Sequence, residues 1–326
     1  MSRYYDLTIT TLPAPGAPVR VVKQWTSHPN GKFDPCALNI EFDIPVTGYD
    51  TPTGGQTITI EGISLSDLQQ AKEFTNLNFV LKAGMKKGLP LANPKQAGVI
   101  VEGFIYQSFG KWVGTEMSLT FVINASSYNI DFPGNFVLNW AAGSSLSNAI
   151  EQTIKTVYPT VPINMNISSD LVLPNDEVGF YSSLNGLAQT IAGITAAQGH
   201  QVYITFQNGA INVFDDTYTP APVEIQFVDL IGQPAWVQIE NMQFTVVMRS
   251  DIQVGSFIKM PKGMKSGPGS TTTAGASLPS SLRYKTAFQG LFYVSDIRQL
   301  GNFRSADGSS WVTVLNCYVA GAAINE

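Results

Sequence analysis

Two histidines and two adjacent carboxylate pairs are the residues whose types could carry out acid–base chemistry in this chain. His28 lies in a His-Pro-Asn-Gly turn, and His200 begins a strand just after a predicted helix end. An imidazolium there would meet the negative end of the helix dipole, so a structural role is favoured for both. Asp176-Glu177 and Asp215-Asp216 fall at predicted turns. Because neighbours in an extended chain point to opposite sides, we expect solvated turn residues rather than an acid–base couple.

Motifs for nucleophilic, zinc or phosphate-binding chemistry are absent from the sequence. No G-x-S-x-G, H-E-x-x-H, C-x-x-C or G-x-x-x-x-G-K-[ST] occurs, and two histidines leave few members for a triad or a metal site. Cys36 and Cys317 are too few for a disulfide framework. We expect reduced, buried thiols, with a bridge between them as the open alternative. The sequence therefore predicts no enzyme and no catalytic, cofactor or metal site.

The composition indicates a β-rich protein that commits much of its surface to neighbours. Charged residues make up only 13% of the 326 positions, while Gly is plentiful. The net charge of −5 argues against a nucleic-acid binder, because phosphate contacts need clustered Lys and Arg. The N-terminus lacks the apolar segment of a signal peptide. Polar residues interrupt the uncharged run at 179–214, so we expect no membrane insertion and folding in a cytoplasm.

The stretch at 179–214 contains no Asp, Glu, Lys or Arg and changes periodicity midway. Apolar residues recur at helical spacing over 184–194, behind two serines that can act as N-caps. Gly199 suits a left-handed C-cap. Apolar residues then alternate on both sides of Asn208-Gly209, which supplies the two residues of a type I′ turn. The stretch predicts a helix packed on a tight hairpin.

A line of small residues runs along this predicted helix. Gly186, Gly193 and Ala197 leave almost no side-chain bulk there, so another backbone can approach closely, either within the fold or from a neighbouring chain. We therefore predict a packing or interface site. Gly193→Leu is expected to damage packing or assembly through overfilling.

The chain around this unit divides into three predicted regions. Alternating apolar residues in 1–130 predict a β domain with one short helix behind Ser64 or Ser66, and a final hairpin of strands 98–108 and 115–124 joined at Gly110-Lys111. Residues 131–219 add a second helix, after Ser144 to Ser147, and form an α+β insert. Residues 220–326 return to β, with a low-complexity stretch at 261–282 that we expect to be a flexible, protease-sensitive loop.

Three segments resemble the baseplate hub proteins of contractile-tailed bacteriophages. They are the central unit YSSLNGLAQTIA to NGAINVF, the stretch ISLSDLQQAKEFTNLNFVLKAGM, and the terminal hairpin around SSWVTVLNC. The hubs of tailocins and of type VI secretion spikes are similar. The resemblance implies two tail-tube-like β-barrel or sandwich domains that flank the small α+β domain.

The same resemblance implies partners and a location. A hub is a homotrimer that contacts the tail tube protein, a central spike protein and other baseplate proteins. Its bore passes DNA, without specific binding, or the tape-measure protein. The location is the virion tail baseplate, assembled in the host cytoplasm. Because the sequence ends at Glu326 without a spike extension, we expect the spike to be a separate polypeptide.

The two terminal hairpins look alike in sequence. Each has a long strand, a Gly-containing turn and a Trp, Trp112 or Trp311, that we expect at the start of the return strand as a packing or interface anchor. This suggests an internal duplication. Three copies of a chain with two like domains would present six nearly equivalent faces, and would adapt a six-fold tube to a three-fold spike.

Two other functions are open alternatives. A β protein of this kind could bind a receptor or carbohydrate without catalysis, through exposed aromatics such as Trp25, Tyr49 and Trp236. A peptidoglycan-cleaving hydrolase is less well supported, because no set of titratable residues stands out.

Overall fold

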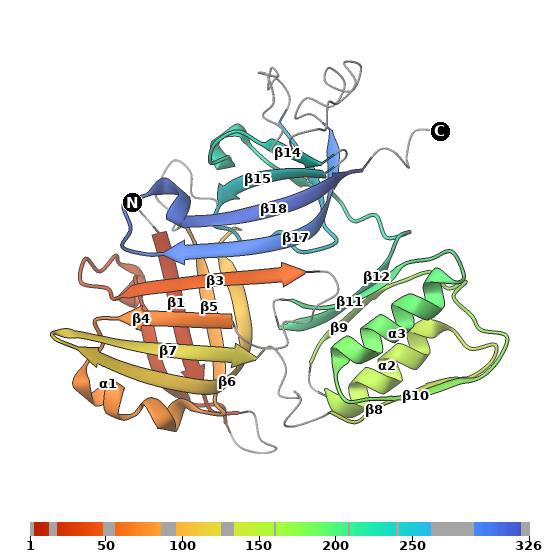
Figure 1. The fold of residues 1–326 in the computed structure, drawn as a ribbon, viewed down its shortest axis with the longest axis horizontal. Coiled ribbons are helices and arrows are strands. Elements are labelled where there is room, and N and C mark those ends of the chain that lie inside the picture. The colour runs from red at the N-terminus through yellow and green to blue at the C-terminus, as the bar shows by residue number, and fades with distance from the viewer. Residues whose placement is uncertain are drawn as a thin grey trace.

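A computed structural model describes residues 3–12, 18–47, 56–85, 96–124, 134–159, 161–207, 209–238, 241–261 and 290–320. Within these ranges the fold is mainly β, with one large antiparallel sheet and a smaller α+β part beside it (Figure 1). The predicted fold class, a mainly β protein with an α+β insert, is confirmed. Tyr49, Asn208 and the predicted loop from position 262 onward lie outside the described residues.

The first region supplies seven strands of the large sheet and its short helices. The strands are β1 (Arg3–Thr10), β2 (Val21–Thr26), β3 (Asn39–Thr47), β4 (Gln56–Glu61), β5 (Asn78–Met85), β6 (Gly98–Val113) and β7 (Glu116–Asn124). The helices are η1 (Pro29–Gly31), α1 (Leu65–Gln69) and η2 (Ala71–Phe74). Ser64 caps α1 by accepting a hydrogen bond from the Asp67 backbone N–H at 3.2 Å, as one of the two predicted serines should.

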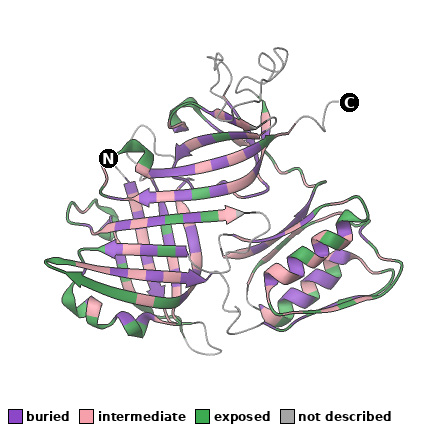
Figure 2. Cartoon of the chain, viewed as in Figure 1, coloured by how far each residue is buried: buried purple, intermediate pink, exposed green. Residues whose placement is uncertain are grey.

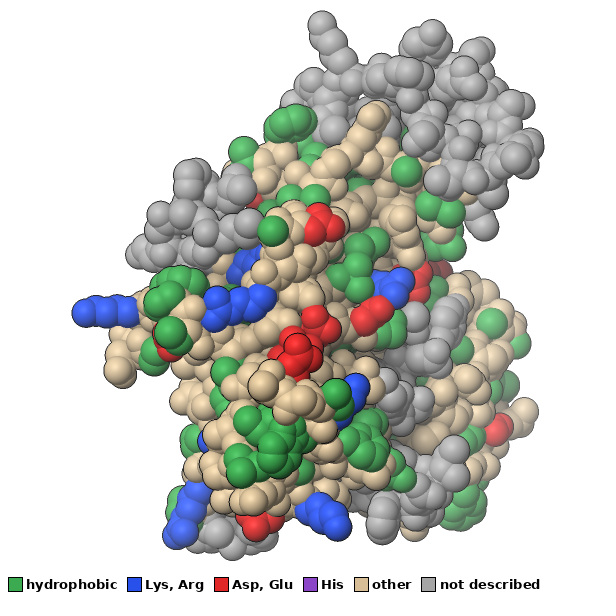
Figure 3. All heavy atoms as spheres, turned by 60° about the vertical axis from the view of Figure 1, so that its left-hand side comes forward, with side chains coloured by type: hydrophobic (Ala, Val, Ile, Leu, Met, Phe, Trp, Pro, Cys, Tyr) green, Lys and Arg blue, Asp and Glu red, His purple; other side chains and the backbone are tan. Residues whose placement is uncertain are grey.

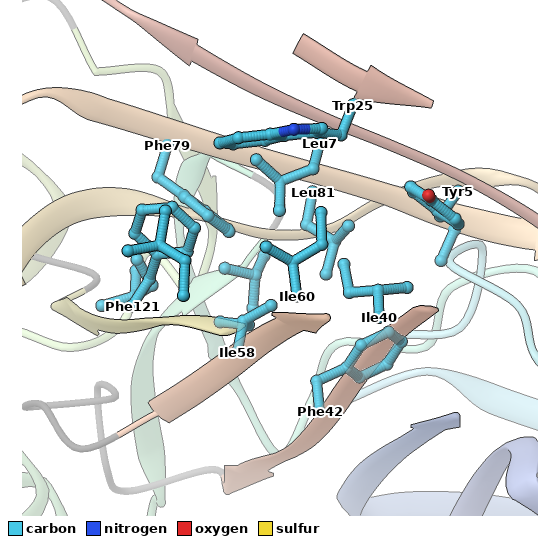
Figure 4. Packing of buried hydrophobic residues seen from close by; sticks show 14 of the residues in the cluster. Tyr5, Leu7, Trp25, Ile40, Phe42, Ile58, Ile60, Phe79, Leu81 and Phe121 are labelled. Atoms are coloured by element: carbon cyan, nitrogen blue, oxygen red, sulfur yellow. The ribbon is translucent and has the colours of Figure 1, made fainter. Parts of the chain in front are cut away.

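Alternation along these strands builds the largest core. Every second residue of β1 is buried, including Tyr5, Leu7 and Ile9. Figure 4 shows side chains of β1 and β5 facing those of β3, β4 and β7 across this core. Trp25 closes it, with its ring 6.1 Å from that of Phe74. The strands therefore wrap two layers around one apolar interior.

The last region extends the same sheet. Its elements are β13 (Val223–Glu224), η3 (Phe227–Asp229), β14 (Ala235–Gln238), β15 (Asn241–Val247), β16 (Phe257–Lys259), β17 (Leu291–Asn302), η4 (Gly308–Ser310) and β18 (Trp311–Val319). The sheet runs β14-β15-β18-β17-β3-β4-β7-β6-β5-β1-β2, with β16 also on β17 and β13 on β16. The first and last regions thus share one continuous sheet, whose first eight strands stack from β14 to β6 in Figure 1.

Both regions repeat one strand order. In the first, six strands are hydrogen-bonded in the path β3-β4-β7-β6-β5-β1; in the last, the path is β14-β15-β18-β17-β16-β13. If the six strands of each path are numbered in chain order from 1 to 6, both paths read 2-3-6-5-4-1. The only difference in direction is that β13 and β16 pair in parallel, whereas β1 and β5 are antiparallel. The topology supports the duplication that the two hairpins suggested.

The insert folds around its own core. Its elements are β8 (Phe136–Trp140), α2 (Leu146–Val157), β9 (Ile163–Asn166), β10 (Glu177–Tyr181), α3 (Leu184–Ala196), β11 (Val202–Gln207) and β12 (Ala210–Asp215). They form a sheet of β8 and β10 and a sheet of β11, β12 and β9. Figure 2 shows buried stripes along α2 and α3. Ser183 caps α3 through the Gly186 N–H at 3.2 Å, Gly199 has a φ of +84°, and β11 pairs with β12 up to Gln207 and Ala210, as predicted.

The end of the first hairpin differs from the prediction. The strand does not stop before Gly110-Lys111 but continues to Val113, and the turn lies at Gly114, whose φ is +61°. Trp112 is therefore the penultimate residue of the outgoing strand β6, whereas Trp311 does begin the return strand β18. Gly110 lies within the extended strand, and glycine is needed there because a Cβ would lie 2.6 Å from Leu68 Cδ1 of α1. The division at 130 and 219 stays a prediction.

Candidate interaction site

The two histidines lie in different regions of the fold. No three His, Cys, Asp or Glu side chains within the described ranges meet as a metal site. His28 is buried, with its Nδ1 2.9 Å from Ser27 Oγ, and His200 Nδ1 lies 3.2 Å from Asp216 Oδ1 at the surface. Asp215 is not the solvated turn residue that we expected: it is 2% exposed and accepts a hydrogen bond from the Ser168 N–H at 2.6 Å.

The cysteines are both free thiols. Cys317 is buried in the core of the last region, as expected, and burial raises the pKa of its thiol. Cys36 is exposed, so the expectation of two buried thiols is wrong for that residue.

A small cavity lies where all three regions meet. Its volume is about 40 Å³, and its lining includes Ile44 and Ile100 of the first region, Phe206 of the insert and Ile252 of the last. Such a space can hold water, but substrate pockets are typically about 300 Å³ or more. The insert touches the large sheet nearby: a Cβ on Gly209 would lie 2.3 Å from Glu102 Oε2. Burial raises the pKa of Glu102, against a smaller lowering by Lys82.

The predicted line of small residues does not pack within the described fold. Gly193 and Ala197 are exposed, and a Cβ added to Gly193 would meet no atom within 4 Å. Gly186 is partly covered by its own helix cap, with Ser183 Oγ 3.5 Å from the Cβ position. Of the two alternatives, close packing inside the chain is wrong at Gly193. An interface with a neighbouring chain stays a prediction.

The two predicted tryptophans lie in opposite environments. Trp311 is 3% exposed, donates its indole N–H to the Gly84 carbonyl at 3.0 Å, and meets the Phe42 ring edge-on at 5.4 Å. It is a packing anchor that joins the first and last regions. Trp112 is 62% exposed, and its indole N–H reaches only Gly114 O in the adjacent turn. Trp25 and Trp236, which we considered for ligand binding, are buried at 8% and 7% exposure.

The junction between the first and last regions is a strand pair, which we call the internal seam. Residues Asp296–Asn302 of β17 pair antiparallel with Thr47–Glu41 of β3. Arg298 Nε donates to Asp43 Oδ1 at 2.7 Å across it, and this hydrogen bond holds the pKa of Asp43 below its ordinary value. Gly301 permits close approach, because a Cβ there would be 2.2 Å from the Phe42 ring.

Arginines fasten the seam at its end. Arg3, on β1, donates to the carbonyls of Asn302 and Ser305, each at 2.6 Å. Arg304 Nε donates to Ala37 O at 3.1 Å. Both therefore tie the connection between β17 and β18 to the first region. No local pattern signals these contacts, because the partners are 267 or more positions apart in the chain.

A buried polar network also connects the first and last regions. Arg249 is 2% exposed and forms a two-pronged ion pair with Asp251, with both N···O distances 2.7 Å. Its Nη1 lies 3.5 Å from Asp229 Oδ2, and Asp229 accepts from Gln96 Nε2 of the first region at 3.2 Å. Because a buried charge is costly unless it is paired, this network favours one fixed arrangement of the two regions.

Exposed apolar side chains lie at the C-terminal end of β6. Phe109, Trp112 and Val113 are 47%, 62% and 59% exposed. A second group lies on the outer face of β8 and β10 in the insert, where Phe180 is 74% exposed. Such groups on a folded surface mark interaction sites when they cluster. The predicted turn at Gly110-Lys111 would place Trp112 on the return strand, so the exposed end of β6 does not follow from that prediction.

Charge does not single out a nucleic-acid surface on the face seen in Figure 3. There Lys and Arg side chains are separated from one another among polar and apolar groups. None of the helices in the described ranges has the length and apolar character that a membrane crossing requires.

Comparison with known proteins identifies a fold but no sequence family. No protein-family model matches the chain, and no curated protein matches its sequence. The fold is similar to that of the tail protein from Neisseria meningitidis, with a TM-score of 0.51, 9% identity and 97% of both chains covered. A 43 kDa tail protein of prophage MuSo2 from Shewanella oneidensis gives a TM-score of 0.49, 9% identity and 98% coverage of both chains.

The fold is also similar to a chain of the Francisella PdpA-VgrG complex. The TM-score is 0.50 at 7% identity, over 97% of this chain and 53% of that one. At these identities the likeness shows a shared fold, which agrees with the fold expected from the resemblance.

Proposed function

We propose that this chain is a structural baseplate hub of a contractile phage tail. It acts as a homotrimer that adapts the six-fold tail tube to a three-fold central spike. The observation that carries the proposal is the repeated strand order of the first and last regions within one sheet. Two like units per chain give six like units in three chains, which is what a contact with a six-fold partner requires.

The similarity to tail proteins supports a tail location, and the similarity to a chain of a VgrG complex supports partners of the spike kind. Tail tube protein, spike protein and other baseplate proteins are the proposed partners. DNA or the tape-measure protein would pass through the bore. The net charge of −5 favours passage over binding, because like charges repel. Assembly would occur in the host cytoplasm, and the role is non-enzymatic.

The experiment that tests the proposal is the symmetry of the particle. The purified protein would be measured by light scattering over a range of concentrations and viewed by negative-stain microscopy. We expect rings of three chains with six similar lobes around a central channel. A protein that stays monomeric at high concentration, or forms rings without six lobes, would contradict the adaptor role.

The non-catalytic receptor- or carbohydrate-binding alternative gains no support from the two tryptophans considered for it, while Tyr49 lies outside the described residues. Trp25 and Trp236 are core residues, and neither can stack on a sugar. A glycan array that gave specific binding to the trimer would nevertheless revive this alternative.

A further inference from the structure

The internal seam forms because β17 is longer than its first partner. Leu291–Tyr293 of β17 pair with β16, and the same edge of β17 then continues into the pairing of Asp296–Asn302 with β3. The strand therefore serves its own region with its first part and the other region with its second part.

In the first region, β6 also extends beyond the strand that pairs with its first part, but no described strand pairs with its second part on that side. Strand β6 pairs with β5 over Gly98–Phe104, and β6 then continues to Val113. Its other edge pairs with β7 along this second part. On the β5 side, Ile105 still exchanges backbone hydrogen bonds with Asn76 and Leu77. Over residues 107–113, no strand in the part of the chain that the structure describes pairs with this edge. Helix α1 and η2 contact β6 through Leu68 and Ala71, and lie against one face there.

A β-bulge fixes which residues of the two strands correspond. In β6 the register with β7 shifts between Ile105 and Gln107, and in β17 the register with β18 shifts between Val294 and Asp296. The residues before the bulge, Ile105 and Val294, are both fully buried. Counting from the bulge, residues 107–113 of β6 correspond to residues 296–302 of β17, the segment that forms the internal seam.

The strand that corresponds to β3 is β14, which ends the sheet. Gln56 of β4 pairs with Ile123, and Met242 of β15 pairs with Cys317. Ile123 and Cys317 face the residues just before the two bulges, so Gln56 corresponds to Met242. The hairpin registers then match Ala235 of β14 with Asp43 of β3. The sheet order of the described chain stops at β14.

We infer that the free edge of β6 pairs with β14 of a second copy of this chain, as β17 pairs with β3 within one chain. Since Leu300 faces Asp43 in the internal seam, Lys111 faces Ala235 of the next copy. The contact is heterologous, so it repeats around a ring and closes when the rotation allows. This inference rests on the homotrimer proposed above, and it identifies the surfaces that would hold the ring together.

At the two edges, apolar residues stand where the internal seam has an exposed ion pair. The internal seam carries Arg298 and Asp43 at its surface, whereas the corresponding positions of the free edges carry Phe109 and Ala235. Phe109 is 47% exposed. With Trp112 and Val113 also exposed, this end of β6 is an edge with uncovered apolar side chains, which is a liability in a monomer unless another strand covers it.

Cysteine cross-linking tests the predicted register. In a Cys36→Ser background, Lys111→Cys and Ala235→Cys are combined, and the assembled protein is oxidised with copper phenanthroline and oxygen. Directly facing residues on paired strands have Cβ atoms close enough for a disulfide. We expect most of the protein in a covalent trimer on a non-reducing gel. Each single-cysteine variant should give no product larger than a dimer.

Two control pairs keep the result interpretable. Asp43→Cys with Leu300→Cys, at the matched position of the internal seam, should cross-link within one chain. Lys111→Cys with Glu224→Cys, on β13, should not form a covalent trimer.

Light scattering of the unoxidised protein separates the two proposals. A trimer that fails to cross-link, while the internal-seam pair succeeds, overturns the edge pairing and leaves the trimeric hub standing. A ladder of products beyond three copies supports the edge pairing and overturns the closed trimer. A monomer at every concentration overturns both.

Discussion

The C-terminal ends of two corresponding strands, β17 and β6, solve the same packing problem differently. At the internal seam, Gly301 lies under the Phe42 ring and opposite the buried Trp311. At the corresponding position of the first region, Trp112 stands 62% exposed opposite the half-buried Met117. The first arrangement is complete within one chain. The second leaves apolar surface uncovered. The strand order therefore repeats in both regions, but only β17 finds a strand partner for its second part within the described chain.

The largest expected effect is the loss of the buried indole. Trp311→Ala removes a side chain that is 3% exposed, together with its hydrogen bond to Gly84 O. We expect a loss of about 3–5 kcal/mol in the free energy of unfolding, measured by urea denaturation. Trp112→Ala is the matched control, and at low protein concentration it should change stability by less than about 0.5 kcal/mol. Similar losses for both variants would remove the contrast between the two ends.

The next effect concerns two glycines and has opposite signs. Gly301→Ala places a Cβ 2.2 Å from the Phe42 ring, so we expect destabilisation of about 1–3 kcal/mol through overpacking. Gly193→Ala adds a Cβ in open space within α3, where alanine should stabilise the helix by about 0.5–1 kcal/mol. Thermal unfolding of both variants measures the pair. A destabilised Gly193→Ala monomer would show that the small-residue line is packed after all.

The open space around Gly193 also changes the expectation for Gly193→Leu. Since the site is open within the described chain, overfilling cannot act on the fold of one copy. Damage should appear only in assembly, and unchanged assembly would mean that this line faces water.

Local signals in the sequence were sufficient for the elements of the insert. The serine cap, the helical spacing and the left-handed Gly199 placed α3 and its hairpin correctly, because each depends on residues within a few positions of one another. The turn after β6 failed because two glycines, Gly110 and Gly114, both suit a turn in sequence. In the structure Gly110 packs against Leu68 of α1 within the strand, and Gly114, with a φ of +61°, lies in the turn.

The seam could not be predicted from the sequence at all. Asp43 and Arg298 are separated by 255 positions, and no local pattern reports which edge strands meet. Alternation predicts which residues of a strand are buried, but it does not predict which strand lies beside it.

A third prediction concerns a substitution that should weaken the contact at the free edge of β6 and leave the internal seam unchanged. Phe109→Asp removes an apolar side chain from the proposed contact between copies and places a charge on the edge strand, where Ala235 of the next copy offers no opposite charge. We expect the concentration for half-assembly to rise about tenfold or more, measured by light scattering, with the thermal stability of the dilute monomer nearly unchanged. Lys72→Asp, on the neighbouring η2 surface, is the control for added charge. Equal effects of the two substitutions would count against the edge.

The smallest effect separates the two contacts by pH. The pKa of Asp43 is lowered in the folded chain, first by its hydrogen bond with Arg298, so the stabilisation is complete above the unfolded pKa of about 3.9. It is lost as the pH falls through the lower folded value. Because the pair is about half exposed, Asp43→Asn should cost only about 0–1 kcal/mol at pH 6, and nothing once wild-type Asp43 is protonated.

A double-mutant cycle with Arg298→Gln isolates the pair from other titrating groups. The coupling energy should be present at pH 6 and vanish at the acid end of the stability range. At the free edge the corresponding residues are Phe109 and Ala235, neither of which titrates. The coupling between Phe109→Ala and Ala235→Gly in assembly should therefore stay constant over the same pH range. A coupling that followed the pH as the Asp43–Arg298 pair does would mean that other, charged surfaces bring the copies together.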